Sequence, residues 1–197
     1  MTALEQFKGH LQEGRVYRRA ELARWSKAVD RHLRHLVEEG FLVRLSGGLY
    51  MRPKKTAFGP APASDEALVG AFLKDGRFLL ASPNQYNKLG LGTTQLYNET
   101  VVYNHKRHGV FKLGGRAFRF AVKPHFPAEA SPEFLLVDAV NNADRLAEDK
   151  DRLLEKVGER AGQMDRRALA RAVREYGGER AKKFFARLLP GVNLRHA

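Results

Sequence analysis

Residues 26–40 hold the pattern that most restricts how this chain can fold. Apolar residues recur there at the spacing of one helical face, namely at Val29, Leu33, Leu36 and Val37. Ser26 can cap the start of such a helix, and Gly40 follows its last apolar residue, where glycine ends helices most easily. At about 100° per residue, three basic residues fall on the opposite side: Lys27, Arg31 and Arg34. The pattern therefore predicts one helix with an apolar back and a cationic front.

A tight two-stranded ribbon is predicted directly after this helix. Residues 41–44 alternate as a strand does, and the serine and two glycines at 46–48 supply the backbone angles of a hairpin turn. With a shorter helix expected before residue 26, the order across residues 16–53 is that of a winged helix–turn–helix, which places its second helix in a DNA groove. Four basic residues flank the ribbon: Arg44, Arg52, Lys54 and Lys55.

These seven cations predict a surface that binds double-stranded DNA. Phosphate binding needs dispersed cations on one face with stems long enough to reach the backbone, and base reading needs a helix in the groove. The alternative is a small helical hairpin with a solvated basic face, because charged residues usually lie at the surface. The coincidence of register favours DNA, since basic residues lie opposite the core stripe and again on the neighbouring ribbon.

Composition agrees with a polyanionic partner. The chain has 197 residues and a net charge of +13, and residues 1–56 hold 12 Lys and Arg against 6 Asp and Glu. The excess of positive charge is thus densest where the DNA-binding motif is predicted. We find no long apolar span, signal peptide or lipidation signal, so we expect no membrane association and a cytoplasmic location. The chain has no cysteine, which excludes disulfides and thiolate metal sites.

A stretch rich in proline, alanine and glycine divides the chain. We expect a winged-helix domain over residues 1–56, an extended linker over 57–64 and an α+β domain over 65–197. In that last domain a small β-sheet unit with helices precedes a C-terminal helical hairpin. Strands are predicted at residues 77–82, 99–103, 109–113 and 116–122. Helices are predicted to begin near residues 65, 82, 131, 145, 165 and 179.

Three segments together resemble the AbiEi-type antitoxins of bacterial type IV toxin–antitoxin systems, in particular their short members. The segments are SKAVDRHLRHLVEEGFLVRLSGGLYMRP, SPNQYNKLGL and VVYNHKRHGVFKLGGRAFRFAVKP. The phrase GGLYMRP fits the GxYxxP pattern of that family, and the resemblance spans roughly residues 15–190.

This resemblance implies a transcriptional autorepressor. Its winged helix would bind an inverted repeat in its own promoter, with Lys27, Arg31 and Arg34 on the recognition helix and Arg44 and Arg52 on the wing. The C-terminal region would counteract a nucleotidyltransferase toxin, and no stable complex with that toxin is expected. A palindromic operator would further imply two copies of the chain on DNA.

Catalysis is an alternative function to DNA binding, and we do not expect this chain to be an enzyme. A nuclease needs a carboxylate cluster, often with Glu-x-Lys on a strand, but Val101 stands where a lysine would have to follow Glu99. Asp138 lies among Leu135, Leu136 and Val137 and could be a partly buried acid, but we expect a salt-bridged or helix-terminal one. His105 and His108 lack a third ligand nearby. The sequence therefore predicts no catalytic residues, no metal site and no cofactor.

A third alternative is an RNA-binding or partner-docking module. Basic residues alternate with aromatic residues in the middle of the chain and could offer cations and stacking faces to a single strand. A half-buried sheet gives the same alternation, and this explanation is the stronger one. The candidate contact residues are Lys106, Arg107, Arg116 and Arg119.

Overall fold

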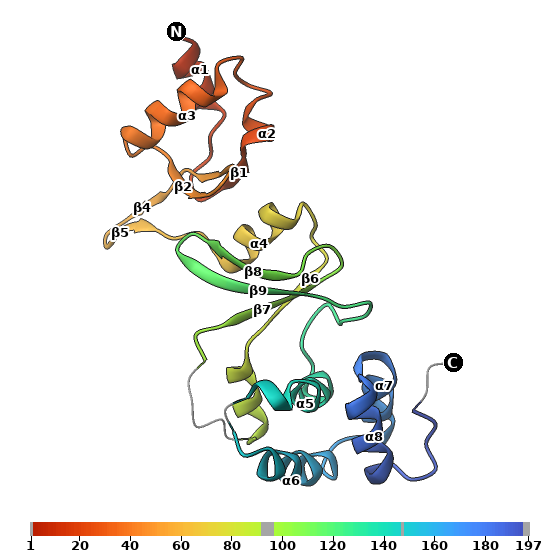
Figure 1. Cartoon of the computed structure of the whole chain (residues 1–197). Coiled ribbons are helices and arrows are strands. Elements are labelled where there is room, and N and C mark those ends of the chain that lie inside the picture. Colours follow the sequence, from red (N-terminus) through yellow and green to blue (C-terminus); the bar gives the residue numbers. More distant parts are fainter. Residues whose placement is uncertain (1, 92–96, 147, 195–197) are drawn as a thin grey trace. The chain divides into compact units, whose positions relative to one another are not determined.

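The computed structural model describes residues 2–91, 97–146 and 148–194. The chain forms two compact units, one from residues 1–76 with 109–118 and the other from residues 77–108 with 119–197. Each unit contains both helices and strands, so the fold is of the mixed α+β kind that the sequence predicts (Figure 1). No helix in the described ranges is both long enough and apolar enough to span a membrane.

The first unit begins with helices around a small antiparallel sheet. In chain order these elements are α1 (Ala3–Gly9), β1 (Val16–Arg18), α2 (Arg19–Leu22), α3 (Val29–Glu38), β2 (Val43–Ser46) and β3 (Leu49–Met51). The strand order is β1-β3-β2, with Val16 and Val43 both paired to Met51 of the central strand. The apolar faces of the three helices meet in one core, which includes Phe7, Tyr17, Leu22, Leu33 and Leu36.

Helix α3 begins later than the sequence predicts. Its N-cap is Ala28, and Ser26 lies outside the helix, where its Oγ accepts a hydrogen bond from the Ala28 N–H at 3.1 Å. The same Oγ lies 2.9 Å from Nδ1 of the buried His32. Ser26 therefore stabilises the turn between α2 and α3, and Lys27 belongs to that turn rather than to the helix.

A second hairpin occupies the stretch that the sequence predicts to be an extended linker. Strands β4 (Lys54–Thr56) and β5 (Gly59–Ala61) pair antiparallel, with Lys55 opposite Pro60. Helix α4 (Asp65–Leu73) follows, capped by the Ser64 hydroxyl, which accepts a hydrogen bond from the Ala67 N–H at 3.1 Å. The prolines of this stretch favoured an extended linker, and local composition could not show that two three-residue strands pair with each other.

The boundary between the units also differs from the sequence prediction. Helix α4 belongs to the first unit, where the Arg18 guanidinium donates to the carbonyl oxygens of Ala71 and, at 2.7 Å, Phe72. Strand β8 (Gly109–Leu113) and the first residues of β9 (Arg116–Val122) join it as well, and the Gly114 N–H donates to the Leu45 oxygen at 2.8 Å. These hydrogen bonds link residues far apart in sequence, so no local pattern could have predicted them.

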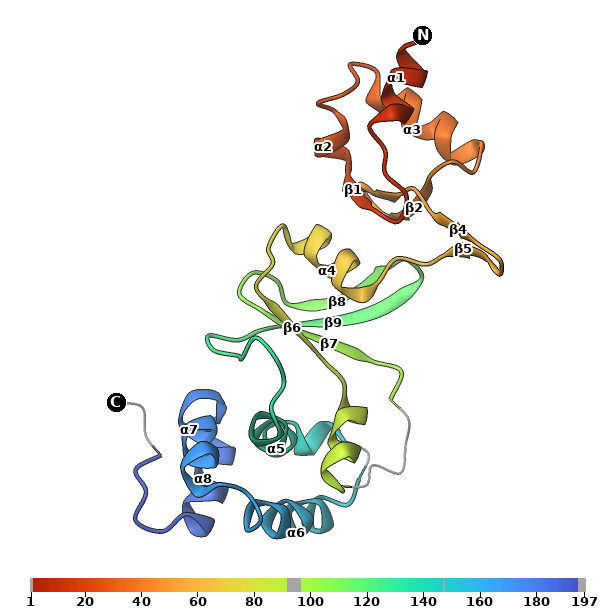
Figure 2. The same ribbon diagram turned by 180° about the vertical axis from the view of Figure 1, so that it is seen from behind.

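The second unit is built around α5 (Pro132–Asn141). Every residue of α5 from Phe134 to Val140 is buried. The other elements of this unit include β6 (Phe78–Ala81), η1 (Pro83–Leu89), β7 (Thr100–Asn104), η2 (Ala143–Arg145), α6 (Lys150–Ala161), α7 (Arg166–Tyr176) and α8 (Glu179–Leu188). Both views show α5 lying among η1, α6, α7 and α8 (Figures 1 and 2). Helix α6 begins five residues later than predicted, because Asp149 supplies its N-cap.

Strands β6 and β7 pair antiparallel, and the sheet order is β6-β7-β9-β8. The hairpin between β8 and β9 turns at Gly114 and Gly115, whose φ angles are 55° and 81°. A tight hairpin turn needs such left-handed angles, which glycine adopts easily, as predicted from the sequence. The predicted bounds of β8 and β9 are confirmed.

Candidate functional site

The strongest candidate site in the first unit is the exposed side of α3 and the turn before it, which we call the α3 basic face. It consists of Lys27, Arg31 and Arg34, all of which are exposed. The spacing of three residues places Arg31 and Arg34 on one side of α3, opposite the buried Leu33 and Leu36, and Lys27 lies in the turn just before the helix. The long, flexible stems of these side chains can carry their charges well beyond the helix.

Two acidic neighbours of this face, Asp30 and Glu39, pair with cations outside it. Asp30 lies next to Arg31, but it pairs with Arg19, whose Nε is 2.6 Å from the Asp30 Oδ1. This hydrogen bond from Arg19 holds the pKa of Asp30 below its usual value, so the carboxylate stays charged and paired. Among the described residues, Lys27 and Arg31 form no salt bridge.

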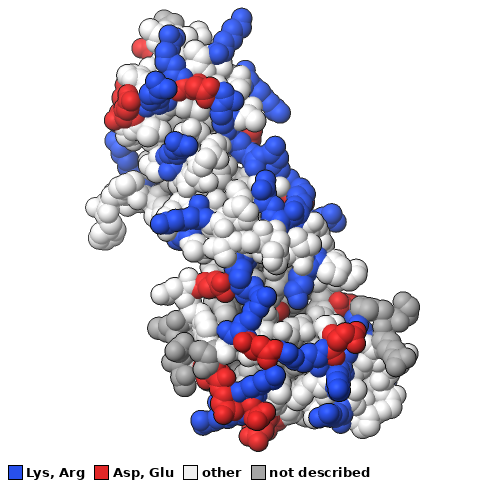
Figure 3. Space-filling view, in the orientation of Figure 1, with Lys and Arg blue, Asp and Glu red and all other residues white. Residues whose placement is uncertain are grey.

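Glu39, at the end of α3, is occupied in the same way. Its Oε2 is 2.7 Å from the Lys8 Nζ and its Oε1 is 3.0 Å from the His35 Nε2. The hydrogen bond from Lys8 lowers the pKa of Glu39. Figure 3 shows Lys and Arg side chains spread over the visible face of the first unit, with only scattered Asp and Glu among them. Lys27 and Arg31 therefore present positive charge that no salt bridge among the described residues compensates, whereas the charge of Arg34 also lowers the pKa of Asp30.

The four cations predicted on the ribbon divide into two groups. Arg44 on β2 and both Lys54 and Lys55 on β4 are exposed and available to a partner. Arg52 is half-buried, and its Nη1 donates to the Leu11 oxygen at 2.7 Å. Its other nitrogen, Nη2, is 3.1 Å from the Glu13 carboxylate, and the guanidinium lies 4.7 Å from the centre of the Phe41 ring. Arg52 thus ties the segment after α1 to the sheet.

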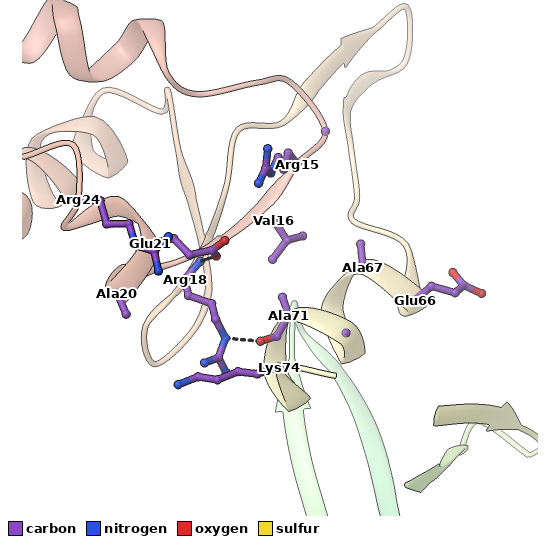
Figure 4. A pocket seen from close by; sticks show the side chains of 12 residues that line it. Arg15, Val16, Arg18, Ala20, Glu21, Arg24, Glu66, Ala67, Ala71 and Lys74 are labelled. Atoms are coloured by element: carbon purple, nitrogen blue, oxygen red, sulfur yellow. Dashed lines mark hydrogen bonds between the residues drawn. The ribbon is translucent and has the colours of Figure 1, made fainter. Parts of the chain in front are cut away.

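A pocket that the sequence did not indicate lies in the same unit, between the β1–α2 segment and α4. Its volume is about 630 Å³, and it is lined by Gly14, Arg15, Val16, Arg18, Ala20, Glu21, Arg24, Glu66, Ala67, Gly70, Ala71 and Lys74. Figure 4 shows Arg18 reaching across to the Ala71 carbonyl at the end of α4. The Glu21 carboxylate accepts from the Arg18 backbone N–H at 2.9 Å. Arg15 and Arg24 remain as exposed cations on its rim.

The structure places the four cations predicted as RNA contacts on two segments, the turn after β7 and strand β9. Arg116 belongs to the first unit and pairs with Asp65 at 2.6 Å, whereas Arg119 belongs to the second and pairs with Glu99 at 3.0 Å. The backbone N–H groups of Lys106 and Arg107 donate to the Asn104 Oδ1 at 2.8 and 2.6 Å, so these two residues form a turn.

The aromatic residues between these cations are not available for base stacking. Tyr103, Phe118 and Phe120 are at most 2% exposed, so their ring faces are covered by protein. Phe111 packs against Phe72, with ring centres 4.9 Å apart. The alternation of charge and aromatic residue is therefore that of a half-buried sheet, the explanation that the sequence already favoured.

The second unit contains a buried carboxyl group whose surroundings the sequence prediction got wrong. Asp138 lies in the middle of α5 and has no salt bridge among the described residues. Instead, the hydroxyls of Tyr86 and Tyr103 each donate to one of its carboxylate oxygens at 2.7 Å. Asn142 adds a hydrogen bond to the Tyr103 hydroxyl at 3.2 Å.

Burial raises the pKa of Asp138, and the hydrogen bonds from the two tyrosines oppose this effect. The cavity beside it measures about 30 Å³, which is the space of about one water molecule. We therefore regard this cluster as a hydrogen-bonded part of the core. In the described ranges, no three His, Asp or Glu side chains lie close enough together to hold a metal ion. His105, one of the two loop histidines, stacks on Phe126 with ring centres 4.7 Å apart.

No family model and no curated protein matches this chain. Its fold is similar to that of the RV2827C protein from Mycobacterium tuberculosis, known from a crystal structure. The similarity covers 98% of this chain and 80% of that one, with a TM-score of 0.58 and 15% sequence identity. At this level of identity the likeness concerns the fold.

Proposed function

We propose that the first unit is a winged helix–turn–helix that binds double-stranded DNA sequence-specifically, with α3 as the recognition helix. The order α1, β1, α2, α3, β2, β3 and the antiparallel β1-β3-β2 sheet support this proposal. In this arrangement α3 packs on the core through one side and leaves the other side open to a groove.

The observation that carries the proposal is the exposed charge of Lys27 and Arg31, neither of which forms a salt bridge among the described residues. Asp30 and Glu39 pair with Arg19 and Lys8, which leaves Lys27 and Arg31 open to an external anion. A helix with such a face in a major groove places long side chains against base edges, where Arg and Lys recognise guanine. We assign this role to Lys27, Arg31 and Arg34.

Contacts to the DNA backbone come from other exposed cations of the same unit. Arg44, Lys54 and Lys55 follow α3 in the chain and would bind phosphates on either side of the groove. Arg24 ends the α2 region only three residues before Lys27, so the basic rim of the pocket adjoins the recognition helix in the chain. In helix–turn–helix proteins the first helix crosses the backbone, and Arg24, in the turn after α2, and Arg15, just before β1, would add phosphate contacts beside it. Arg52 supports the sheet instead.

On the likeness of its motifs to AbiEi-type antitoxins, we further propose that the chain is a cytoplasmic antitoxin. It would repress its own promoter at an inverted repeat, with two copies of the chain on the DNA. It would also counteract a nucleotidyltransferase toxin without forming a stable complex with it, and we assign that activity to the second unit. The alternative is a winged helix that docks only proteins or RNA and has no antitoxin role.

The test compares binding of the intact chain to its own upstream DNA and to a scrambled duplex, measured by fluorescence anisotropy across a range of salt concentrations. The proposal predicts tighter binding to the upstream DNA, with a preference that persists as salt rises, because base contacts are less salt-dependent than phosphate contacts. Equal affinity for both duplexes, lost steeply with salt, would mean a general polyanion surface. A folded chain without any salt-dependent DNA affinity would favour the docking alternative.

A further inference from the structure

The hairpin of β4 and β5 carries a fully exposed aromatic side chain. Phe58 lies at its tip, next to Ala57, and it is the most exposed large apolar residue of the described chain. Apolar side chains of this size are normally covered in a folded protein, because burial of their surface is favourable. Phe58 on this turn is therefore accessible to a partner that has an apolar place for it.

The tip is held in shape by its own hydrogen bonds. The Thr56 Oγ1 donates to the Gly59 oxygen at 2.6 Å and accepts from the Phe58 N–H at 3.3 Å. Prolines at positions 53, 60 and 62 restrict the backbone on both sides. Because the turn is braced in this way, Phe58 is presented outward with little conformational freedom left to its backbone.

The charge around the hairpin identifies the class of partner. No Asp or Glu occurs between Glu39 and Asp65, while Arg44, Lys54 and Lys55 do, together with Arg52, which pairs with Glu13. Lys54 and Lys55 lie on β4 itself, and both are exposed. A partner that suits this hairpin has an anionic surface for Lys54 and Lys55 and an apolar interior that Phe58 can enter. Duplex DNA meets both conditions, because its phosphates surround a stack of aromatic bases.

We propose that Phe58 is a wedge that enters the minor groove and inserts between two base pairs, while Lys54 and Lys55 bind the flanking phosphates. Apolar side chains inserted in this way unstack one base step and kink the duplex toward the major groove. The inference rests on the proposed DNA-binding function and adds a second contact, distinct from α3, that bends the DNA.

Bending can be measured by energy transfer between dyes on the two ends of a duplex taken from the chain's own upstream DNA. We expect the intact chain to raise the energy transfer, and Phe58→Ala to abolish that rise and weaken binding about tenfold. Phe58→Leu should retain the bend, since leucine also serves as a wedge. Val110→Ala is the matched control, because Val110 is another exposed apolar residue of the same unit, and it should leave both readouts unchanged.

Since Phe58 is exposed, its replacement should not alter the thermal melting of the chain, and this check separates a lost contact from lost folding. If Phe58→Ala bends and binds the duplex as the unchanged chain does, the wedge is overturned while the proposed function stands. If the unchanged chain binds no duplex at low salt, both proposals fail. Binding to vesicles of phosphatidylcholine and phosphatidylserine that disappears with Phe58→Ala would assign the tip to a membrane surface instead.

Discussion

Asp30 and Glu39 determine which cations near α3 remain unpaired. Each carboxylate lies on or next to that helix, and each is bound by a cation outside the α3 basic face. The sequence predicted the basic face from helical spacing, but it could not show that Arg19 and Lys8 neutralise the neighbouring acids. That arrangement makes the face a better candidate for DNA than a mixed-charge helix surface would be.

The ribbon lysines should contribute through charge alone. Lys54 and Lys55 are exposed on β4, and we expect them to contact phosphates rather than bases. Replacement of either by alanine should weaken binding to all duplexes alike and lower the slope of log affinity against log salt by about one. Anisotropy titrations at several salt concentrations measure this slope. A loss of affinity for the upstream DNA alone would instead assign the lysine to a base contact.

Asp138 should make stability depend on pH in a definite direction. Because burial raises its pKa above the ordinary value of 3.8, the folded state favours the protonated carboxyl group. The contribution of Asp138 to stability is thus fully present below that ordinary value and is lost as pH rises through its higher folded pKa. The unfolding free energy of the unchanged chain, relative to Asp138→Asn, should therefore fall as pH rises. Urea unfolding followed by circular dichroism over a pH series measures this difference, and a difference that grows with pH would contradict the assignment.

Among the elements, the join between α7 and α8 leaves no space for a side chain. A Cβ at Gly177 would lie 2.4 Å from the Val173 oxygen. The adjacent Gly178 N–H and the Tyr176 oxygen are both hydrogen-bonded to the Asn141 side chain, at 2.9 and 3.0 Å. The connection is therefore fixed to α5 and cannot move easily to relieve a clash.

We expect Gly177→Ala to destabilise the chain by about 1–3 kcal/mol, as overpacking does elsewhere. Gly158→Ala is its control, because Gly158 lies inside α6, where an added Cβ would have no neighbouring atom within 4 Å outside the helix backbone. That change should be neutral or stabilise by about 0.5–1 kcal/mol, since alanine favours helices. Thermal melting of the two variants compares them. Equal melting temperatures would show that the α7–α8 connection is not tightly packed.

Elements with strong local signals were predictable from the sequence. Helices begin next to residues 131 and 165 as predicted, with Ser131 and Asp165 as the N-caps of α5 and α7, and Gly114 and Gly115 turn the predicted β8–β9 hairpin. Elements that depend on partners distant in the sequence were not predictable. Strand β1 has only three residues and exists through its pairing with β3, and the β4–β5 hairpin lies in a stretch whose prolines suggested a linker.

The candidate site shows the same division. Helical period and charge were enough to predict Arg31 and Arg34 on an exposed face, because both follow from positions within one helix. The role of Arg52 could not be predicted, since its partners Leu11 and Glu13 lie about 40 residues away in the chain. The tyrosine partners of Asp138 are likewise distant, so the sequence suggested a salt bridge where the structure has two hydroxyl donors.

For the whole molecule, the division into two units suggests that the two proposed activities can be separated. The α3 basic face lies in the first unit, and the second unit, which also contains β6 and β7, is built around α5. In cells that express a nucleotidyltransferase toxin of the kind opposed by AbiEi-type antitoxins, the double variant Lys27→Ala/Arg31→Ala should still protect growth. The same variant should fail to repress a reporter driven by its own promoter. Loss of protection together with repression would place the antitoxin activity in the first unit.

The most direct test of the central claim, that α3 reads DNA, is the affinity of Arg31→Ala for the chain's own upstream duplex. The matched control is Arg167→Ala, which removes an exposed arginine from α7 in the second unit. We predict that Arg31→Ala costs about 1–3 kcal/mol on the upstream duplex and much less on a scrambled one, as loss of a base contact should. The control should bind like the unchanged chain. If Arg31→Ala and the control bind the upstream duplex equally well, α3 is not the recognition helix.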